Sequence, residues 1–212
     1  MTRRHGIIVL WILLLLGSVL IAQEQEVAVP EGDVPPEDSS LKAGDLAPSW
    51  ALMYAPGKFE FLKNWTIEKG QRLRRFSTQP DRHIVVLSFF ATWCQPCMKE
   101  LPHLQNLYEA YEGKKVKFFL IDITEATRNN PGFEDSPHAG EFLTKKGITI
   151  PILYDTRGVA KDRYHVSTLP RLFIIDRYQT VRLTKKGFHE GEDFEGELTH
   201  MIDQLLAESD GD

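Results

Sequence analysis

VVLSFFATWCQPCMKELPHL, residues Val85–Leu104, is the stretch that decides the fold of this 212-residue chain. Its first part belongs to an apolar run, His83–Phe90, that is rich in β-branched and aromatic residues, as expected of a buried central strand. After Cys97, apolar residues recur at helical spacing as far as Gly113. The chain's only two cysteines, Cys94 and Cys97, therefore fall where a strand gives way to a helix.

The rest of the chain continues this alternation of strand and helix. A second buried strand is predicted over Lys115–Ile123, and a later helix is predicted to begin with Ser136 as N-cap and Pro137 as its first residue. Pro102 lies inside the first helix and should kink it. Further elements are predicted as a hairpin of 50–53 with 58–62, a hairpin of 171–176 with 180–186, and a final helix over 194–206. This order predicts an α/β fold with a central mixed β-sheet and helices on both faces.

The position of the cysteine pair has a chemical consequence. Cys94 falls at the predicted helix N-terminus, where unpaired N–H groups and the helix dipole favour a thiolate, which is the nucleophile in disulfide exchange. Cys97 lies one turn inside the helix and could resolve a mixed disulfide. A zinc site is disfavoured because the chain has no second cysteine pair and no closely spaced histidines. A purely structural disulfide is disfavoured because so short a loop adds little stability.

The composition and the first residues indicate where the protein acts. With 42% hydrophobic residues and a net charge of −5, the chain is globular and gives no reason to expect a nucleic-acid partner. Basic residues precede an uncharged apolar run over 6–22, which predicts that residues 1–22 are a signal anchor or transmembrane segment, or a cleaved signal peptide. Residues 23–45 are acidic and contain prolines, so they are interpreted as a tether before a domain over 46–208 and a disordered tail over 209–212.

The segment FFATWCQPCMKELPHL resembles the active-site segment of thioredoxin-fold proteins, and among them the membrane-anchored TlpA/ResA-type thiol–disulfide oxidoreductases. The resemblance extends to AGDLAPSWAL (Ala43–Leu52) and to the segment Gly147–Val181. It implies a thioredoxin-like fold with an N-terminal β-hairpin extension. It also implies that the redox-active disulfide Cys94–Cys97 works without a metal or any other cofactor.

The resemblance further implies roles for the residues around the cysteines. Pro170 matches the family's cis-proline, which packs opposite the cysteine pair and lets the backbone of Leu169 pair with an extended substrate segment. Leu169 and Arg171 would tune the choice of substrate. Trp93 matches the family tryptophan that shields the sulfurs and shapes the contact surface. Cys94 would be the attacking thiolate.

Proton handling is assigned to Glu100, which follows Cys97 by three residues and matches the glutamate of the ResA-type pattern. Residues at i and i+3 share a helix face, so this carboxylate could act on Cys97 through a water molecule. Ordinary thioredoxins carry a buried aspartate where this chain has Ser88, which leaves Glu100 as the candidate. The segment Thr124–His138 is longer than is usual in the family and is predicted to be a surface loop.

The expected function is an extracytoplasmic thiol–disulfide oxidoreductase, in the periplasm or on the outer face of the inner membrane. It would reduce disulfide-containing protein substrates, in cytochrome c or copper-site maturation, and would draw on a membrane thiol–disulfide electron donor. Two alternatives stay open on the same fold. One is a copper-binding assembly module in which His138, His165 or His189 approaches the cysteines. The other is a thiol peroxidase, although the chain lacks a P-x-x-x-T-x-x-C pattern.

Overall fold

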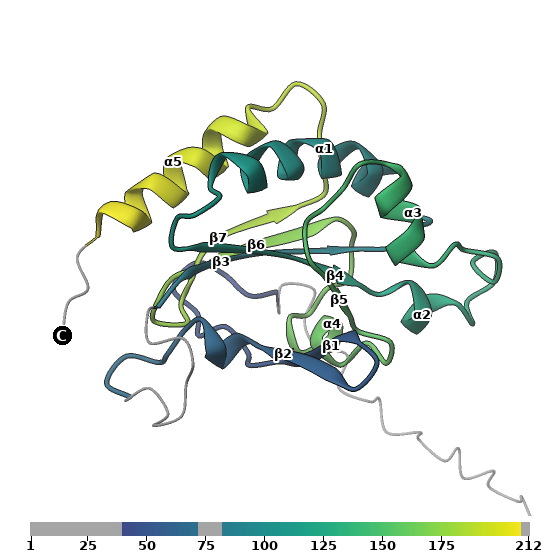
Figure 1. Ribbon diagram of the computed structural model, residues 1–212, viewed down its shortest axis with the longest axis horizontal. Helices are drawn as coiled ribbons and strands as arrows, with labels where there is room; N and C mark the ends of the chain where they lie inside the picture. Colours follow the sequence, from purple (N-terminus) through teal and green to yellow (C-terminus); the bar gives the residue numbers. More distant parts are fainter. Residues whose placement is uncertain (1–39, 72–81, 209–212) are drawn as a thin grey trace, which may run out of the picture. The chain divides into compact units, whose positions relative to one another are not determined.

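The computed structural model describes residues 40–71 and 82–208, which form a seven-stranded mixed β-sheet covered by helices (Figure 1). The strands follow the order β2-β1-β5-β4-β3-β6-β7 across the sheet. Their bounds are β1 Ala51–Ala55, β2 Lys58–Phe61, β3 Ile84–Phe90, β4 Val116–Asp122, β5 Ile152–Tyr154, β6 Arg171–Ile175 and β7 Val181–Lys186. The prediction of a thioredoxin-like mixed sheet is confirmed, and β1 with β2 forms the expected N-terminal hairpin.

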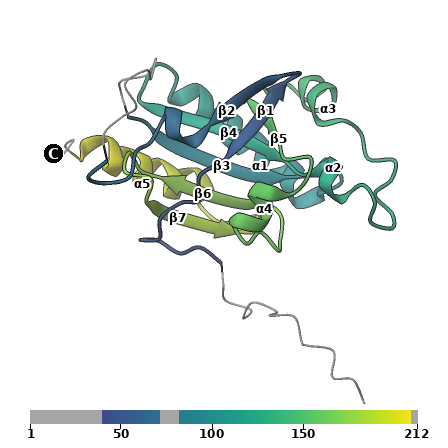
Figure 2. The same ribbon diagram turned by 90° about the horizontal axis from the view of Figure 1, so that it is seen from below.

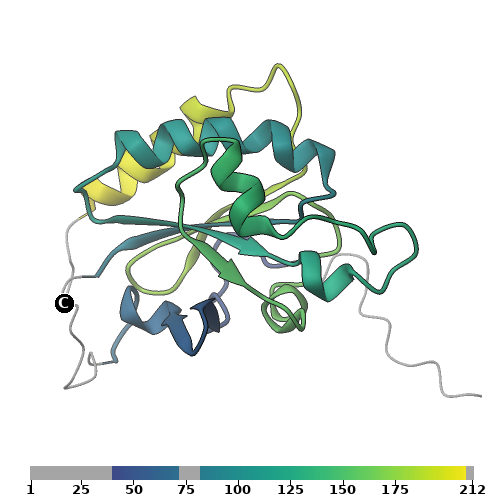
Figure 3. The ribbon, with the colours of Figure 1, turned by 45° about the vertical axis from the view of Figure 1, so that its right-hand side comes forward.

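Helices cover both faces of this sheet. Helices α1, α3 and α5 lie on one face and α4 lies on the other, as Figures 1 and 3 show and as the view from the α4 side in Figure 2 confirms. Their bounds are α1 Gln95–Ala110, α2 Thr124–Thr127, α3 Ala139–Lys145, α4 Val159–Arg163 and α5 Phe194–Ala207, with a 3-10 turn over Leu62–Asn64. The first helix continues past Pro102.

Strand β3 is the centre of the molecule, as its apolar run predicts. It pairs in parallel with β4 from Ile84↔Val116 to Phe90↔Asp122, and antiparallel with β6 on its other side. All seven of its residues are buried. A strand with neighbours on both edges and helices over both faces leaves no side chain in water, so its residues do not alternate between apolar and polar.

One predicted boundary is wrong. Helix α3 begins at Ala139 with His138 as its N-cap, two residues after the predicted N-cap Ser136. The Ser136 hydroxyl instead donates to the carbonyl of Phe133 and closes a turn in the preceding segment. Pro137 stays outside the helix, and its carbonyl accepts a hydrogen bond from the hydroxyl of Thr92.

The predicted export segment 1–22, most of the tether and the tail 209–212 lie outside the described residues. Within the part of the chain that the structure covers, none of the helices has the length and apolar character needed to cross a bilayer. The described chain joins the domain near the end of the predicted tether, where the Gly44 N–H donates to the carbonyl of Val181 and Leu46 forms a bridge with Thr180.

Candidate redox site

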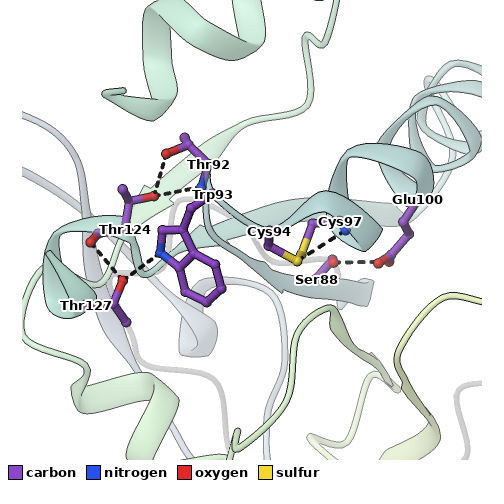
Figure 4. Close-up of a disulfide and its surroundings, with 8 residues drawn as sticks. All are labelled: Ser88, Thr92, Trp93, Cys94, Cys97, Glu100, Thr124 and Thr127. Atoms are coloured by element: carbon purple, nitrogen blue, oxygen red, sulfur yellow. Dashed lines mark hydrogen bonds between the residues drawn. A yellow bond between two sulfur atoms is a disulfide. The ribbon is translucent and has the colours of Figure 1, made fainter. Parts of the chain in front are cut away.

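The two cysteines lie where β3 leads into α1, and they form a disulfide with an S–S distance of 2.05 Å (Figure 4). Cys94 is the N-cap residue of α1, and its sulfur accepts a hydrogen bond from the Cys97 N–H at 3.2 Å. Pro96 occupies the first turn, where a missing N–H costs nothing. Cys94 is 4% exposed and Cys97 is 1% exposed, so Cys94 is the slightly more accessible residue of the pair.

This arrangement fits disulfide exchange. An N–H aimed at the Cys94 sulfur, together with the positive end of the helix dipole, stabilises negative charge on that sulfur once the disulfide is reduced. Cys97 is bonded to Cys94 and more deeply buried, as a resolving cysteine requires. The strand-to-helix position of the pair is therefore as predicted.

Glu100 is a buried acid rather than a solvated helix residue. It is 2% exposed, and one of its carboxylate oxygens accepts a hydrogen bond from the Ser88 hydroxyl at 3.1 Å, across from helix α1 to strand β3 (Figure 4). Burial raises the pKa of Glu100 from 4.5 to about 8, although the Ser88 bond and the positive charge of Lys185 both lower it. At neutral pH this carboxyl group mostly holds its proton.

Pro170 immediately precedes strand β6, and the Leu169–Pro170 peptide bond is cis, as the resemblance implies. Arg171 pairs with Phe89 across β3 and β6, which brings Pro170 to the end of β3 that leads to the cysteines. Pro170 is buried and Leu169 is partly buried. Arg171 is buried too, at 6% exposed, with its guanidinium over the ring of Phe173, so it is not an ordinary surface charge.

Trp93, directly before Cys94, contacts two residues that the sequence does not identify as its partners. Its indole N–H donates to the Thr127 hydroxyl at 2.9 Å, and its ring stacks on Phe133 with centroids 4.1 Å apart and planes 10° apart. Both partners belong to the 124–138 segment, which was predicted to be a surface loop. That prediction is wrong in part, because the segment begins with helix α2 and packs against the site.

The histidines considered for copper do not form a ligand cluster in the described part of the chain, where no group of three or more His, Cys, Asp or Glu is placed to hold a metal ion. His138 pairs with Glu125 at 3.0 Å and leaves 85% of its side chain exposed.

Fold and site together define a thioredoxin-like protein with an exchange-competent cysteine pair. The sequence profile of the AhpC/TSA family matches residues 44–184, and the chain belongs to this family. More narrowly, it belongs with the ResA-type thiol–disulfide oxidoreductases. It is 30% identical over 162 residues to the thiol-disulfide oxidoreductase ResA of Geobacillus kaustophilus, a match that covers 76% of this chain and 79% of that protein.

Two further comparisons agree. The sporulation thiol-disulfide oxidoreductase A of Bacillus subtilis is 31% identical over 102 residues, which cover 48% of this chain and 58% of that protein. The crystal structure of StoA from Bacillus subtilis superimposes with a TM-score of 0.52 at 22% identity, over 73% of this chain and 96% of that one. The structural likeness supports the fold, and the sequence matches support the oxidoreductase class.

Proposed function

We propose that this chain is an extracytoplasmic reductase of protein disulfides, with Cys94 as nucleophile, Cys97 as resolving cysteine and Glu100 as proton carrier. The observation that carries the proposal is the disulfide at the N-cap of α1, in which the Cys97 N–H points at the Cys94 sulfur. The direction of electron flow, toward the substrate, is proposed from the resemblance of the active-site segment to TlpA/ResA-type oxidoreductases.

The reaction begins with the reduced chain. The Cys94 thiolate attacks one sulfur of the substrate disulfide, and the other substrate sulfur leaves as a thiolate that takes a proton from water. Cys97 then gives its proton to Glu100 and attacks the Cys94 sulfur; the bond from Cys94 to the substrate breaks, and the second substrate sulfur leaves as a thiolate that takes a proton from water. The substrate gains two electrons and two protons, and the chain is left with the Cys94–Cys97 disulfide that the structure shows.

Glu100 is suited to the proton that Cys97 loses and regains. It lies one turn from Cys97 on α1, and its pKa of about 8 keeps it protonated at neutral pH in the oxidised state. When a thiolate of the electron donor attacks Cys94, Cys97 leaves as a thiolate, and Glu100 can supply its proton. The same proton returns to Glu100 when Cys97 attacks the mixed disulfide, so both half-reactions use one carrier.

Substrate binding is assigned to the surface around Cys94, the more accessible residue of the pair. The backbone at Leu169, next to the cis Pro170, would pair with an extended substrate segment on one side of Cys94. Trp93 would contact the substrate on another side. The proposed substrates are disulfide-containing proteins, including cytochrome c precursors with oxidised haem-site cysteines or proteins with oxidised copper sites.

The place of action is proposed from the sequence of residues 1–22, whose basic start and apolar run favour export and membrane anchoring. A membrane dithiol protein would then be the electron donor. Fractionating cells that make the full chain tests this, and recovery in the cytoplasmic fraction would contradict it.

The mechanism is tested by trapping with a Cys97→Ser variant of the full chain. This variant should accumulate mixed disulfides through Cys94 that disappear on treatment with dithiothreitol, because the resolving thiol is gone. A Cys94→Ser variant should trap none. If the Cys97→Ser variant also traps none in cells that express the protein, the assigned roles are wrong.

The direction of electron flow and the peroxidase alternative have separate tests. A reduction potential of about −270 mV, as in thioredoxin, supports a reductase, and one of about −120 mV would indicate an oxidant. Reduced protein that consumes hydrogen peroxide faster than it reduces protein disulfides would favour a thiol peroxidase instead.

A further inference from the structure

The two residues that precede Cys94 are both tied to the 124–138 segment. The Thr92 N–H donates to the Thr124 hydroxyl at 3.0 Å, and the Thr92 hydroxyl donates to the Pro137 carbonyl at 2.9 Å. The Trp93 indole N–H donates to the Thr127 hydroxyl, which Figure 4 shows on α2 beside the Trp93 ring. Three hydrogen bonds from two adjacent residues thus reach both ends of the segment.

The segment is also braced from within. Arg128 forms two bonds to the carboxylate of Glu125, at 2.7 and 2.8 Å, and donates a third to the carbonyl of Glu134 at 2.7 Å. The Ser136 hydroxyl donates to the Phe133 carbonyl at 2.7 Å. Bidentate pairs of this kind fix the geometry of both partners. Phe133 is therefore held in place against Trp93 by its own segment.

The stacked pair of Trp93 and Phe133 makes an aromatic surface beside the nucleophilic cysteine. Both rings are only half-buried, so each keeps area for a further contact. Trp93 is the residue directly before Cys94. When a substrate cysteine reaches the Cys94 sulfur, the substrate side chain next to that cysteine therefore comes close to this surface. An apolar or aromatic substrate side chain adds binding free energy when it contacts this surface, whereas a glycine adds none.

We propose that the 124–138 segment is a substrate-recognition element in which Thr127 and Phe133 position Trp93. The Trp93–Phe133 pair then selects substrates that carry an aromatic or large apolar side chain next to the reactive cysteine. This inference rests on the proposed disulfide-exchange function and adds the class of substrate segment that it prefers.

The test uses two synthetic peptides of equal length with an intramolecular disulfide, one with phenylalanine and one with glycine before the first cysteine. The reduced full chain is mixed with each, and the rate constant of peptide reduction is measured in single turnover. The chain should reduce the phenylalanine peptide roughly tenfold faster than the glycine peptide, the gain expected of one added aromatic contact.

Phe133→Ala should bring the ratio of the two rate constants, phenylalanine peptide to glycine peptide, close to one. Phe133→Leu, which keeps an apolar side chain without the stacking, should retain part of the preference. Phe59→Ala is the matched control, because Phe59 lies on β2, is 51% exposed and is remote in the fold from the cysteines.

Thr127→Val tests the positioning role. It should shift the indole N–H resonance of Trp93 in ¹H–¹⁵N spectra and weaken the peptide preference, while the reduction potential of the cysteine pair stays unchanged. An unchanged resonance would remove Thr127 from the proposal.

The outcomes distinguish a failure of the proposed disulfide exchange from a failure of the proposed recognition role. If the unchanged chain reduces neither peptide, the proposed function itself fails. If it reduces both peptides at the same rate, or if Phe133→Ala slows both equally, disulfide exchange stands and the recognition role of the 124–138 segment is overturned.

Discussion

Replacing Glu100 with glutamine should change how the stability of the oxidised protein depends on pH. The pKa of Glu100 rises from 4.5 in the unfolded chain to about 8 in the folded one because the carboxyl group is buried. Between these values the folded state holds a proton that the unfolded state has released, so the free energy of unfolding falls as pH rises through this window. Below pH 4.5 both states are protonated and no loss occurs.

The size of the effect follows from the two pKa values. Each pKa unit corresponds to about 1.4 kcal/mol, so the full loss above pH 8 is about 5 kcal/mol. Glutamine has nearly the same shape, cannot ionise, and offers a carbonyl oxygen to the Ser88 hydroxyl. Glu100→Gln should therefore match the unchanged protein within about 1 kcal/mol at pH 5 and exceed it by about 5 kcal/mol at pH 9.

The measurement is urea or guanidinium unfolding of both oxidised proteins from pH 5 to pH 9. The disulfide removes the cysteines from the titration, and the difference between the two curves cancels the other titrating groups. Glu112→Gln is the control, because Glu112 is exposed just after α1. Parallel curves of unfolding free energy against pH for Glu100→Gln and the unchanged protein would show that Glu100 is not protonated in the folded state. That result would also contradict its proposed role as a proton carrier.

Three further substitutions follow from buried hydrogen bonds. Ser88→Ala removes a bond that lowers the folded pKa of Glu100, so the decline in unfolding free energy should still begin near pH 4.5 but continue to higher pH and become larger, as the same unfolding series would show. Thr124→Val leaves the buried Thr92 N–H without its acceptor and removes the hydroxyl donor to Asp122, which keeps its bond from the backbone N–H of residue 124, so it should cost about 1–3 kcal/mol in unfolding free energy; Thr144→Val, at an exposed site, should cost far less. Tyr164→Phe keeps the buried ring but loses the bond from its hydroxyl to a backbone carbonyl, which should lower the thermal midpoint by the equivalent of about 1 kcal/mol.

The parts of the fold that the sequence predicts well are those encoded locally. The apolar run of β3 and the helical spacing after Cys97 place the cysteines at a strand-to-helix junction. A strand buried on both faces has a continuous apolar sequence, and a helix has apolar residues three or four positions apart, so both patterns can be recognised in the sequence. The cis bond before Pro170 was predicted from resemblance alone, since local sequence gives an X–Pro bond little tendency to be cis.

The parts that were missed depend on contacts between distant residues. Thr127 and Phe133 meet Trp93 across more than thirty positions, and no local pattern marks them as partners. The sequence showed only that their segment was unusually long. Likewise, the sequence alone presents Ser88 only as the absence of an aspartate. In the structure Ser88 donates the hydrogen bond to Glu100, a contact between a strand and a helix that residue spacing does not reveal.

The attachment of the 124–138 segment has a consequence for how this protein can diversify. Thr92 and Trp93 fix the segment to the main domain through bonds to Thr124, Thr127 and the Pro137 carbonyl, and Thr124 is also bonded to Asp122 at the end of β4. Between these points, the bonds of Arg128 and Ser136 stay within the segment, while Phe133 stacks on Trp93. The sequence of this part can therefore be exchanged as a cassette, by mutation or by design, while the geometry of the exchange chemistry is preserved.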